Sequence, residues 1–147
     1  MKNLSWMLSA TGLFVLLAVG SIHAQKPSEP VDQSAADFEK QLAVVAAEIS
    51  KRAPMMVDSE TRLDRVTAGP GKQLNYLNTL ITVSADEIDP DAFRDALVPM
   101  VKESTCKNDG IHKLFEAGIT VNYVYSGKDG VEILRFPLTP EDCGSSP

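Results

Sequence analysis

The chain contains 147 residues with a formal net charge of −6 at pH 7, and 44% of its residues are hydrophobic. A chain of this length is expected to form one domain around one core. Its acidic balance argues against nucleic acid and anionic lipid as partners, because both require clusters of Lys and Arg. A protein partner, including a cationic one, fits this charge better, although many proteins are acidic only because net charge keeps them soluble.

The first 24 residues have the pattern of a secretory signal peptide. Lys2 precedes an apolar run from Leu13 to Val19, and Ala24 supplies a small residue before polar Gln25. Polar residues interrupt the apolar stretch, which falls short of the ~20 residues that a membrane-spanning helix needs. We therefore predict cleavage after Ala24 and a bacterial protein that is periplasmic or secreted, without membrane insertion. The alternative is that the segment is retained as an anchor.

Cleavage would leave 123 residues, with 13 basic and 20 acidic side chains and a net charge of −7. Residues 25–33 are polar, contain two prolines and show no periodicity, so they are predicted to be a flexible leader. Residues 34–147 are predicted to form a single α+β domain.

The first half of this domain predicts a helix and a hairpin. Apolar residues recur at helical spacing over residues 34–53, and Pro54 ends the pattern. Residues 55–66 alternate, which predicts a strand with one charged face. A turn at 68–71 leads to a partner strand over 74–83. The apolar helix residues are Phe38, Leu42, Val45 and Ile49, and the charged strand residues are Asp58, Glu60, Arg62 and Asp64.

The second half predicts two helices and another hairpin. Asp89 followed by Pro90 is a strong helix start, and Asn108 opens a short third helix that Gly118 is placed to end. A second hairpin is predicted over residues 119–138. In its first strand the side chains of Tyr123 and Tyr125 share a face with apolar residues, so these tyrosines either end in water or line a groove.

The predicted order of elements is αββααββ. Strands paired through tight turns favour an antiparallel sheet of about four strands, and three amphipathic helices can cover one of its faces. The sequence thus predicts an α+β fold with all three helices on one face. The uncovered face is expected to be polar and to carry the function.

The cysteines and the reactive side chains predict structure rather than catalysis. In an oxidising compartment Cys106 and Cys143 most simply form one disulfide. A redox or metal pair is the alternative, but such motifs have closer spacing. His112 is the only histidine after cleavage, and no nucleophile motif accompanies it. We predict no catalytic residue, no metal site and no cofactor.

Carboxylates are the one catalytic resource in supply. Asp58 and Glu60 could act as the paired acids of a hydrolase. Arg62 lies beside them in the same charged row and would favour their ionised forms. A solvated row of charges is therefore the preferred interpretation.

Three separated motifs occur along the chain: Pro54–Asp64 (PMMVDSETRLD), Asn75 and Tyr76 before Thr79 and Leu80, and Gly118 with Tyr123 and Tyr125 before Gly130. In these motifs and their order the chain resembles a family of small exported bacterial proteins over most of its mature length. The resemblance carries no activity with it. The family often has a second aromatic residue where this chain has Asn78, which weakens the case for an aromatic surface shared by the two hairpins.

These observations favour a non-catalytic interaction protein of the bacterial cell envelope, such as an inhibitor, an immunity protein or an accessory protein. The protein partner is expected to bind the exposed sheet face. The candidate surface residues are Asp58, Glu60, Arg62, Asp64, Tyr123 and Tyr125. The alternatives are a small-ligand carrier with a groove at the two tyrosines, or a hydrolase that uses Asp58 and Glu60.

Overall fold

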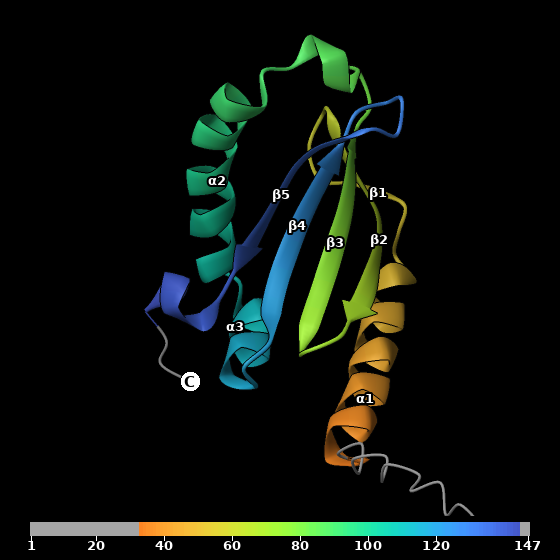
Figure 1. Ribbon diagram of the computed structural model, residues 1–147, viewed down its shortest axis with the longest axis vertical. Coiled ribbons are helices and arrows are strands. Elements are labelled where there is room, and N and C mark those ends of the chain that lie inside the picture. Colours follow the sequence, from red (N-terminus) through yellow and green to blue (C-terminus); the bar gives the residue numbers. More distant parts are fainter. Residues whose placement is uncertain (1–32, 145–147) are drawn as a thin grey trace, which may run out of the picture.

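The computed structural model describes residues 33–144, so the predicted signal peptide and residues 25–32 of the predicted leader lie outside the described residues. No helix within this described part has the length and apolar composition that crossing a membrane requires. The elements in chain order (Figure 1) are α1 (Gln33–Ser50), β1 (Met55–Met56), β2 (Thr61–Gly69), β3 (Gln73–Leu80), the 3-10 helix η1 (Ala85–Glu87), α2 (Pro90–Cys106), α3 (Asp109–Glu116), β4 (Thr120–Ser126), β5 (Glu132–Leu138) and the 3-10 helix η2 (Pro140–Cys143).

The sheet has five strands in the order β1-β2-β3-β4-β5. Neighbouring strands are antiparallel except β3 and β4, which pair in parallel. The α+β class is confirmed, but the purely antiparallel four-stranded sheet is wrong on both counts. The parallel pair arises because α2 and α3 carry the chain back to the end where β3 began, so β4 runs in the same direction.

The additional strand, β1, arises within the segment that was predicted to be one strand over residues 55–66. The Asp58 carboxylate accepts hydrogen bonds from the backbone N–H groups of Glu60 and Thr61, both at 2.8 Å, and the Val57 N–H donates to the Thr61 carbonyl at 2.8 Å. These bonds fold residues 57–60 into a tight turn of the kind that Asp side chains stabilise. The charged row is therefore divided between a turn and a strand.

The helix starts are those that the sequence predicts. The Asp89 side chain accepts from the N–H groups of Asp91 and Ala92 at the start of α2. The Asn108 side chain caps α3 in the same way. Gly118 follows α3 with a φ of +71°, a left-handed conformation that suits glycine and turns the chain into β4.

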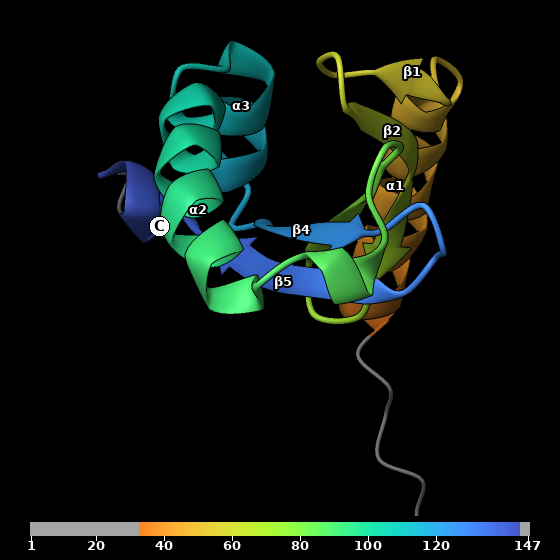
Figure 2. The same ribbon diagram turned by 90° about the horizontal axis from the view of Figure 1, so that it is seen from above.

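All three helices pack on one face of the sheet, as predicted, and they form two clusters. Leu42 and Ala46 of α1 pack against β2 and β3, whereas Ile111 and Phe115 of α3 pack with β4 and β5, and α2 joins this second cluster. Figure 2 shows α1 standing apart from α2 and α3 across the sheet. The core is thus divided in two, and Leu114 is one of the residues that contact both clusters.

Candidate functional site

A groove of about 610 Å³ lies between the two helical clusters. Its floor is the helix-covered face of β2, β3 and β4. One wall comes from α1 and the segment after it, including Val57 just beyond β1, and the other wall comes from α2, α3 and the residues between them. The floor residues are Leu63, Tyr76, Asn78, Tyr123 and Tyr125. The wall residues are Val45, Ile49, Arg52, Val57, Val101, Ser104, Thr105, Asn108, Gly110, Ile111 and Leu114.

Aromatic rings contact one another across β3, β4 and β5, and the three tyrosines among them line the groove floor. Tyr76 of β3 lies directly opposite Tyr123 of β4, with ring centroids 5.5 Å apart. Phe136 of β5 stacks on Tyr123 at 5.7 Å and on Tyr125 at 6.3 Å. An aromatic surface therefore does connect the two hairpins, although Asn78 replaces one ring. The chain contains three tyrosines, and all three lie in this floor.

The tyrosine hydroxyls differ in their partners. The Tyr123 hydroxyl is 2.8 Å from the Thr105 hydroxyl of α2. The hydroxyls of Tyr76 and Tyr125 form no side-chain hydrogen bond to the described residues. Among those residues, every fully buried polar side-chain atom has a hydrogen-bond partner, so these two hydroxyls are not fully buried. Each of these hydroxyls therefore keeps some solvent exposure, and both tyrosines line the groove, where an occupant could contact them.

Asn78 places a hydrogen-bond acceptor in the floor. Its side chain is 6% exposed, and its Nδ2 donates to the backbone carbonyls of Tyr76 at 3.2 Å and Val124 at 3.3 Å. Two carbonyl acceptors fix the orientation of the amide, because only the NH₂ group can donate to them. The Oδ1 atom has no donor among residues 33–144 and faces the groove.

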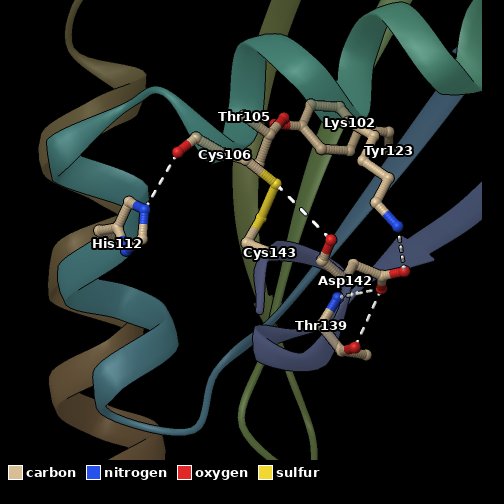
Figure 3. The surroundings of a disulfide bond; sticks show 8 residues. All are labelled: Lys102, Thr105, Cys106, His112, Tyr123, Thr139, Asp142 and Cys143. Carbon is tan, nitrogen blue, oxygen red and sulfur yellow. Dashed lines mark hydrogen bonds and ion pairs between the residues drawn. A yellow bond between two sulfur atoms is a disulfide. The ribbon is translucent and has the colours of Figure 1, made fainter. Parts of the chain in front are cut away.

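The disulfide confirms the predicted pairing of Cys106 with Cys143 and holds one groove wall. It joins the last residue of α2 to the last residue of η2, with Cα atoms 5.3 Å apart and a sequence separation of 37. Figure 3 shows Lys102 and Asp142 beside it, joined by an ion pair at 3.2 Å. Because Thr105 precedes Cys106, the disulfide anchors the turn of α2 that forms the wall.

His112 has a structural role in the same region. Its Nε2 lies 3.0 Å from the backbone carbonyl oxygen of Cys106, near the end of α2 (Figure 3). A hydrogen bond there satisfies one of the carbonyls that a helix leaves unpaired at its end. Among the described residues, the His112 ring has no hydrogen bond or ion pair to a nucleophile or a carboxylate.

The predicted surface residues do not lie together. Tyr123 and Tyr125 belong to the groove on the helix-covered face, not to the uncovered one. Leu63 also faces the groove, so its strand neighbours Arg62 and Asp64 point to the opposite side of the sheet. Asp58 and Glu60 lie in the turn before β2. The six residues are therefore divided among the groove, the uncovered face and the turn before β2. Burial, then Tyr123 and then the charge of Asp58 raise the pKa of Tyr125, so Asp58 still acts on that tyrosine.

The uncovered face carries polar side chains beside apolar Leu77 and Val124, and several of the polar side chains bond to one another. Asn122 donates from Nδ2 to Gln73 Oε1 at 2.9 Å and to Asn75 Oδ1 at 3.0 Å. Asp64 accepts from Arg62 through one oxygen and from the Thr79 hydroxyl through the other. A partner bound here would have to replace these bonds. The groove, whose polar atoms are partly unpaired, is the better candidate site.

The alternative hydrolase is not supported by the geometry of its proposed acids. Asp58 uses one carboxylate oxygen to hold its own turn. Backbone hydrogen bonding, first from Glu60 and then from Thr61, lowers the pKa of the Asp58 carboxyl. A general acid at neutral pH needs the opposite shift. Within residues 33–144 no three His, Cys, Asp or Glu side chains are grouped so as to hold a metal ion.

Titration of the tyrosines should report on the groove. Burial, followed by the neighbouring Tyr123, raises the pKa of Tyr76 to about 12, and burial also raises the pKa of Tyr125. These tyrosines contribute to stability at pH values below about 10, where they are neutral in both the folded and the unfolded chain. That contribution is lost as the pH rises from about 10 in the unfolded chain through about 12 in the folded one.

We expect the folded protein to show little tyrosinate absorbance at a pH near 10, whereas the urea-unfolded chain should be about half ionised there. Parallel ultraviolet titrations in buffer and in urea measure this difference. Equal titration curves would mean that the groove floor is fully open to water.

Comparisons with known proteins place the fold but name no family. No protein-family model matches the chain. Protein K of Escherichia coli is 31% identical over an alignment of 103 residues that covers 67% of this chain and 53% of Protein K. The chain therefore spans about half the length of that relative.

Three solved structures resemble this chain. A secreted protein of Pseudomonas aeruginosa matches with a TM-score of 0.62 and 20% identity, covering 74% of this chain and 95% of that one. A pilotin of the Vibrio vulnificus type 2 secretion system has a TM-score of 0.61 and 13% identity, covering 78% and 97%. The type II secretion pilotin of Vibrio cholerae has a TM-score of 0.58 and 18% identity, covering 76% and 96%. Because all three identities are 20% or lower, these matches show only that the chain shares a fold with two pilotins and a secreted protein.

Proposed function

We propose that this protein is a periplasmic or secreted, non-catalytic accessory protein of the bacterial cell envelope that binds an apolar segment of a partner protein in the groove. The observation that carries the proposal is the groove itself, with an aromatic floor on a sheet and no catalytic arrangement among the described residues that line it. Export is supported by the signal-peptide pattern of residues 1–24 and agrees with the similarity to a secreted protein and to secretion-system pilotins. The motifs around Pro54–Asp64 support membership of the exported family described above.

A protein partner is favoured by apolar surface that continues beyond the groove. Val45 and Val57 line the groove and are 38% and 61% exposed. Met55 and Met56, which precede Val57, are 45% and 46% exposed. Contiguous exposed apolar side chains are typical of interaction surfaces, and methionine adapts to differently shaped partners. This rim extends the apolar contact area that a partner segment could bury.

A small-ligand carrier is the second candidate. The groove volume lies within the range of about 300–1,000 Å³ that is usual for ligand pockets, and its tyrosines could stack on a ligand. A small ligand would, however, leave the apolar rim at β1 exposed. Tyrosine fluorescence that changes with a metabolite, but not with any protein from the host, would favour this candidate.

Blocking the groove wall should weaken partner binding. Val45→Arg places an unpaired cation over the apolar wall, whereas Val44→Arg adds the same charge to the same helix at a position that is 63% exposed and outside the groove. We expect affinity capture from the host periplasm, at low and at high salt, to retain a stoichiometric protein partner on the native chain and on Val44→Arg. Val45→Arg should bind it at least ~10-fold more weakly, because the added cation would be buried against the apolar segment without a counter-charge.

Comparable thermal midpoints of the two variants would show that both are folded. Equal retention of the partner by Val45→Arg and Val44→Arg would contradict the groove as the contact site. Arg65 lies at an exposed position in β2 outside the groove. If Arg65→Glu lost the partner while Val45→Arg retained it, the contact site would have to lie on the uncovered face of the sheet.

A further inference from the structure

Among the described residues, the groove has one charged side chain in its lining, and that charge is positive. Arg52 follows the C-terminal end of α1 and lines the groove beside Ile49 and Val57. All other lining side chains are apolar or uncharged, although the chain as a whole carries a net charge of −6. The charge of the lining is therefore opposite in sign to that of the protein. Asp58 lies outside the lining, although its charge reaches Tyr125 in the floor.

Arg52 has no ion-pair partner within the described part of the chain. The nearest acidic residue on α1, Glu48, pairs with Lys51 at 2.5 Å, so that carboxylate is already engaged. Elsewhere, Arg62 and Arg135 both pair with carboxylates, Asp64 and Glu132 respectively. Among residues 33–144, the Arg52 guanidinium thus has no carboxylate partner, and it lies at the edge of an apolar groove.

A free guanidinium in this position selects for a carboxylate. Its planar group of N–H donors matches the two oxygens of a carboxylate, and such charge-assisted bonds are among the strongest in proteins. The apolar side chains around Arg52 would exclude part of the water once the groove is filled, which strengthens the interaction. An amine at the same place would be repelled.

We propose that the partner segment that fills the groove is apolar and carries a carboxylate at its end over Arg52. The proposal rests on the proposed function and specifies its ligand. The carboxylate can be an Asp or Glu side chain or the C-terminus of the partner. The overall acidic charge is compatible with a cationic partner, whereas Arg52 assigns an acidic group to the segment in the groove.

Selection of peptides tests this proposal even while the partner is unidentified. Random linear peptides displayed on phage would be selected against the full chain as exported by its host, in the native form, as Arg52→Glu and as Arg65→Glu. Arg65 is an exposed β2 arginine outside the groove, with no ion pair to the described residues, so its reversal makes the same change in net charge. The selected peptides would be synthesised with free and amidated C-termini, and their affinities measured.

We expect peptides selected on the native chain to combine apolar residues with an acidic group at a fixed position. Arg52→Glu should bind them about 10- to 100-fold more weakly, in line with the loss of a charge-assisted bond and the gain of a repulsion, and Arg65→Glu should bind them as the native chain does. A Lys in place of the acidic residue should restore affinity for Arg52→Glu. Loss of affinity on amidation would identify the C-terminus as the acidic group. Arg52→Gln is the second variant if Arg52→Glu does not fold.

Two results would overturn the proposal in distinguishable ways. In the first result, the selected peptides do not bind Val45→Arg, contain no fixed acidic group, and bind Arg52→Glu as tightly as Arg65→Glu. That result would contradict the proposed carboxylate contact but would leave the groove as a protein-binding site. Enrichment of no peptide that depends on Val45 would overturn the proposed function and this proposal with it.

Discussion

Replacing Phe115 by alanine is expected to lower the free energy of unfolding by about 3 to 5 kcal/mol, the usual cost of deleting a buried aromatic ring. Phe115 is 1% exposed and belongs to the cluster that joins α3 to β4 and β5. A domain of ordinary stability has about 5 to 15 kcal/mol in total, so this single change would remove a large part of it. Urea unfolding followed by circular dichroism measures the loss.

The matched control is Glu116→Ala, which removes an exposed side chain from the neighbouring position of α3. Its effect should stay within about 0.5 kcal/mol, as is usual for surface substitutions. Because Ile111 and Leu114 of α3 line the groove, Phe115→Ala should also weaken peptide binding. A loss below about 1 kcal/mol would show that the wall formed by α3 is not packed on the sheet as described.

Removing the disulfide is the second change with a large expected effect. The double variant Cys106→Ser and Cys143→Ser should lose about 2 to 5 kcal/mol of stability, the range found for native disulfides of small exported domains. The bond closes a long stretch of chain, with a sequence separation of 37 between its ends, so the unfolded state gains much freedom when it is absent. The thermal midpoint should fall accordingly.

Reduction separates the disulfide from other effects of the serines. Dithiothreitol should lower the midpoint of the native protein to near that of the double variant and should leave the double variant unchanged. Release of the end of α2 should also increase hydrogen exchange around Thr105, whose hydroxyl contacts Tyr123 in the groove floor. A midpoint that is insensitive to reduction would mean that Lys102 and Asp142, with the surrounding packing, hold the wall without the bond.

The sequence predicts the elements better than it predicts their arrangement. The starts of α2 and α3 are encoded locally, because Asp89 and Asn108 cap the helices that follow them. The turn at residues 57–60 escapes prediction because it depends on which backbone groups the Asp58 carboxylate reaches, which alternation does not reveal. The parallel pairing has a signal that the hairpin pattern obscures: two consecutive helices between β3 and β4 form a crossover, which permits parallel strands.

The candidate site is predicted only in part for the same reason. That Tyr123 and Tyr125 share a face, with a groove as one outcome, follows from strand alternation and is confirmed. Tyr76 and Asn78 join them only because parallel register sets residues 76 and 78 opposite 123 and 125. Arg52 escapes prediction because its place at the groove depends on where α1 ends relative to β1, and a lone arginine at a helix end has no distinguishing pattern.

Because the core is divided into two clusters, the two walls of the groove come from two separate segments of the sequence. One wall and its part of the floor come from residues 45–78, and the opposite wall with its part of the floor comes from residues 101–125. Substitutions that do not share contacts usually have independent effects, so each wall can diverge between relatives without disturbing the packing of the other. Tyr76 and Leu114 contact both clusters, so a substitution at either position affects the packing of both walls.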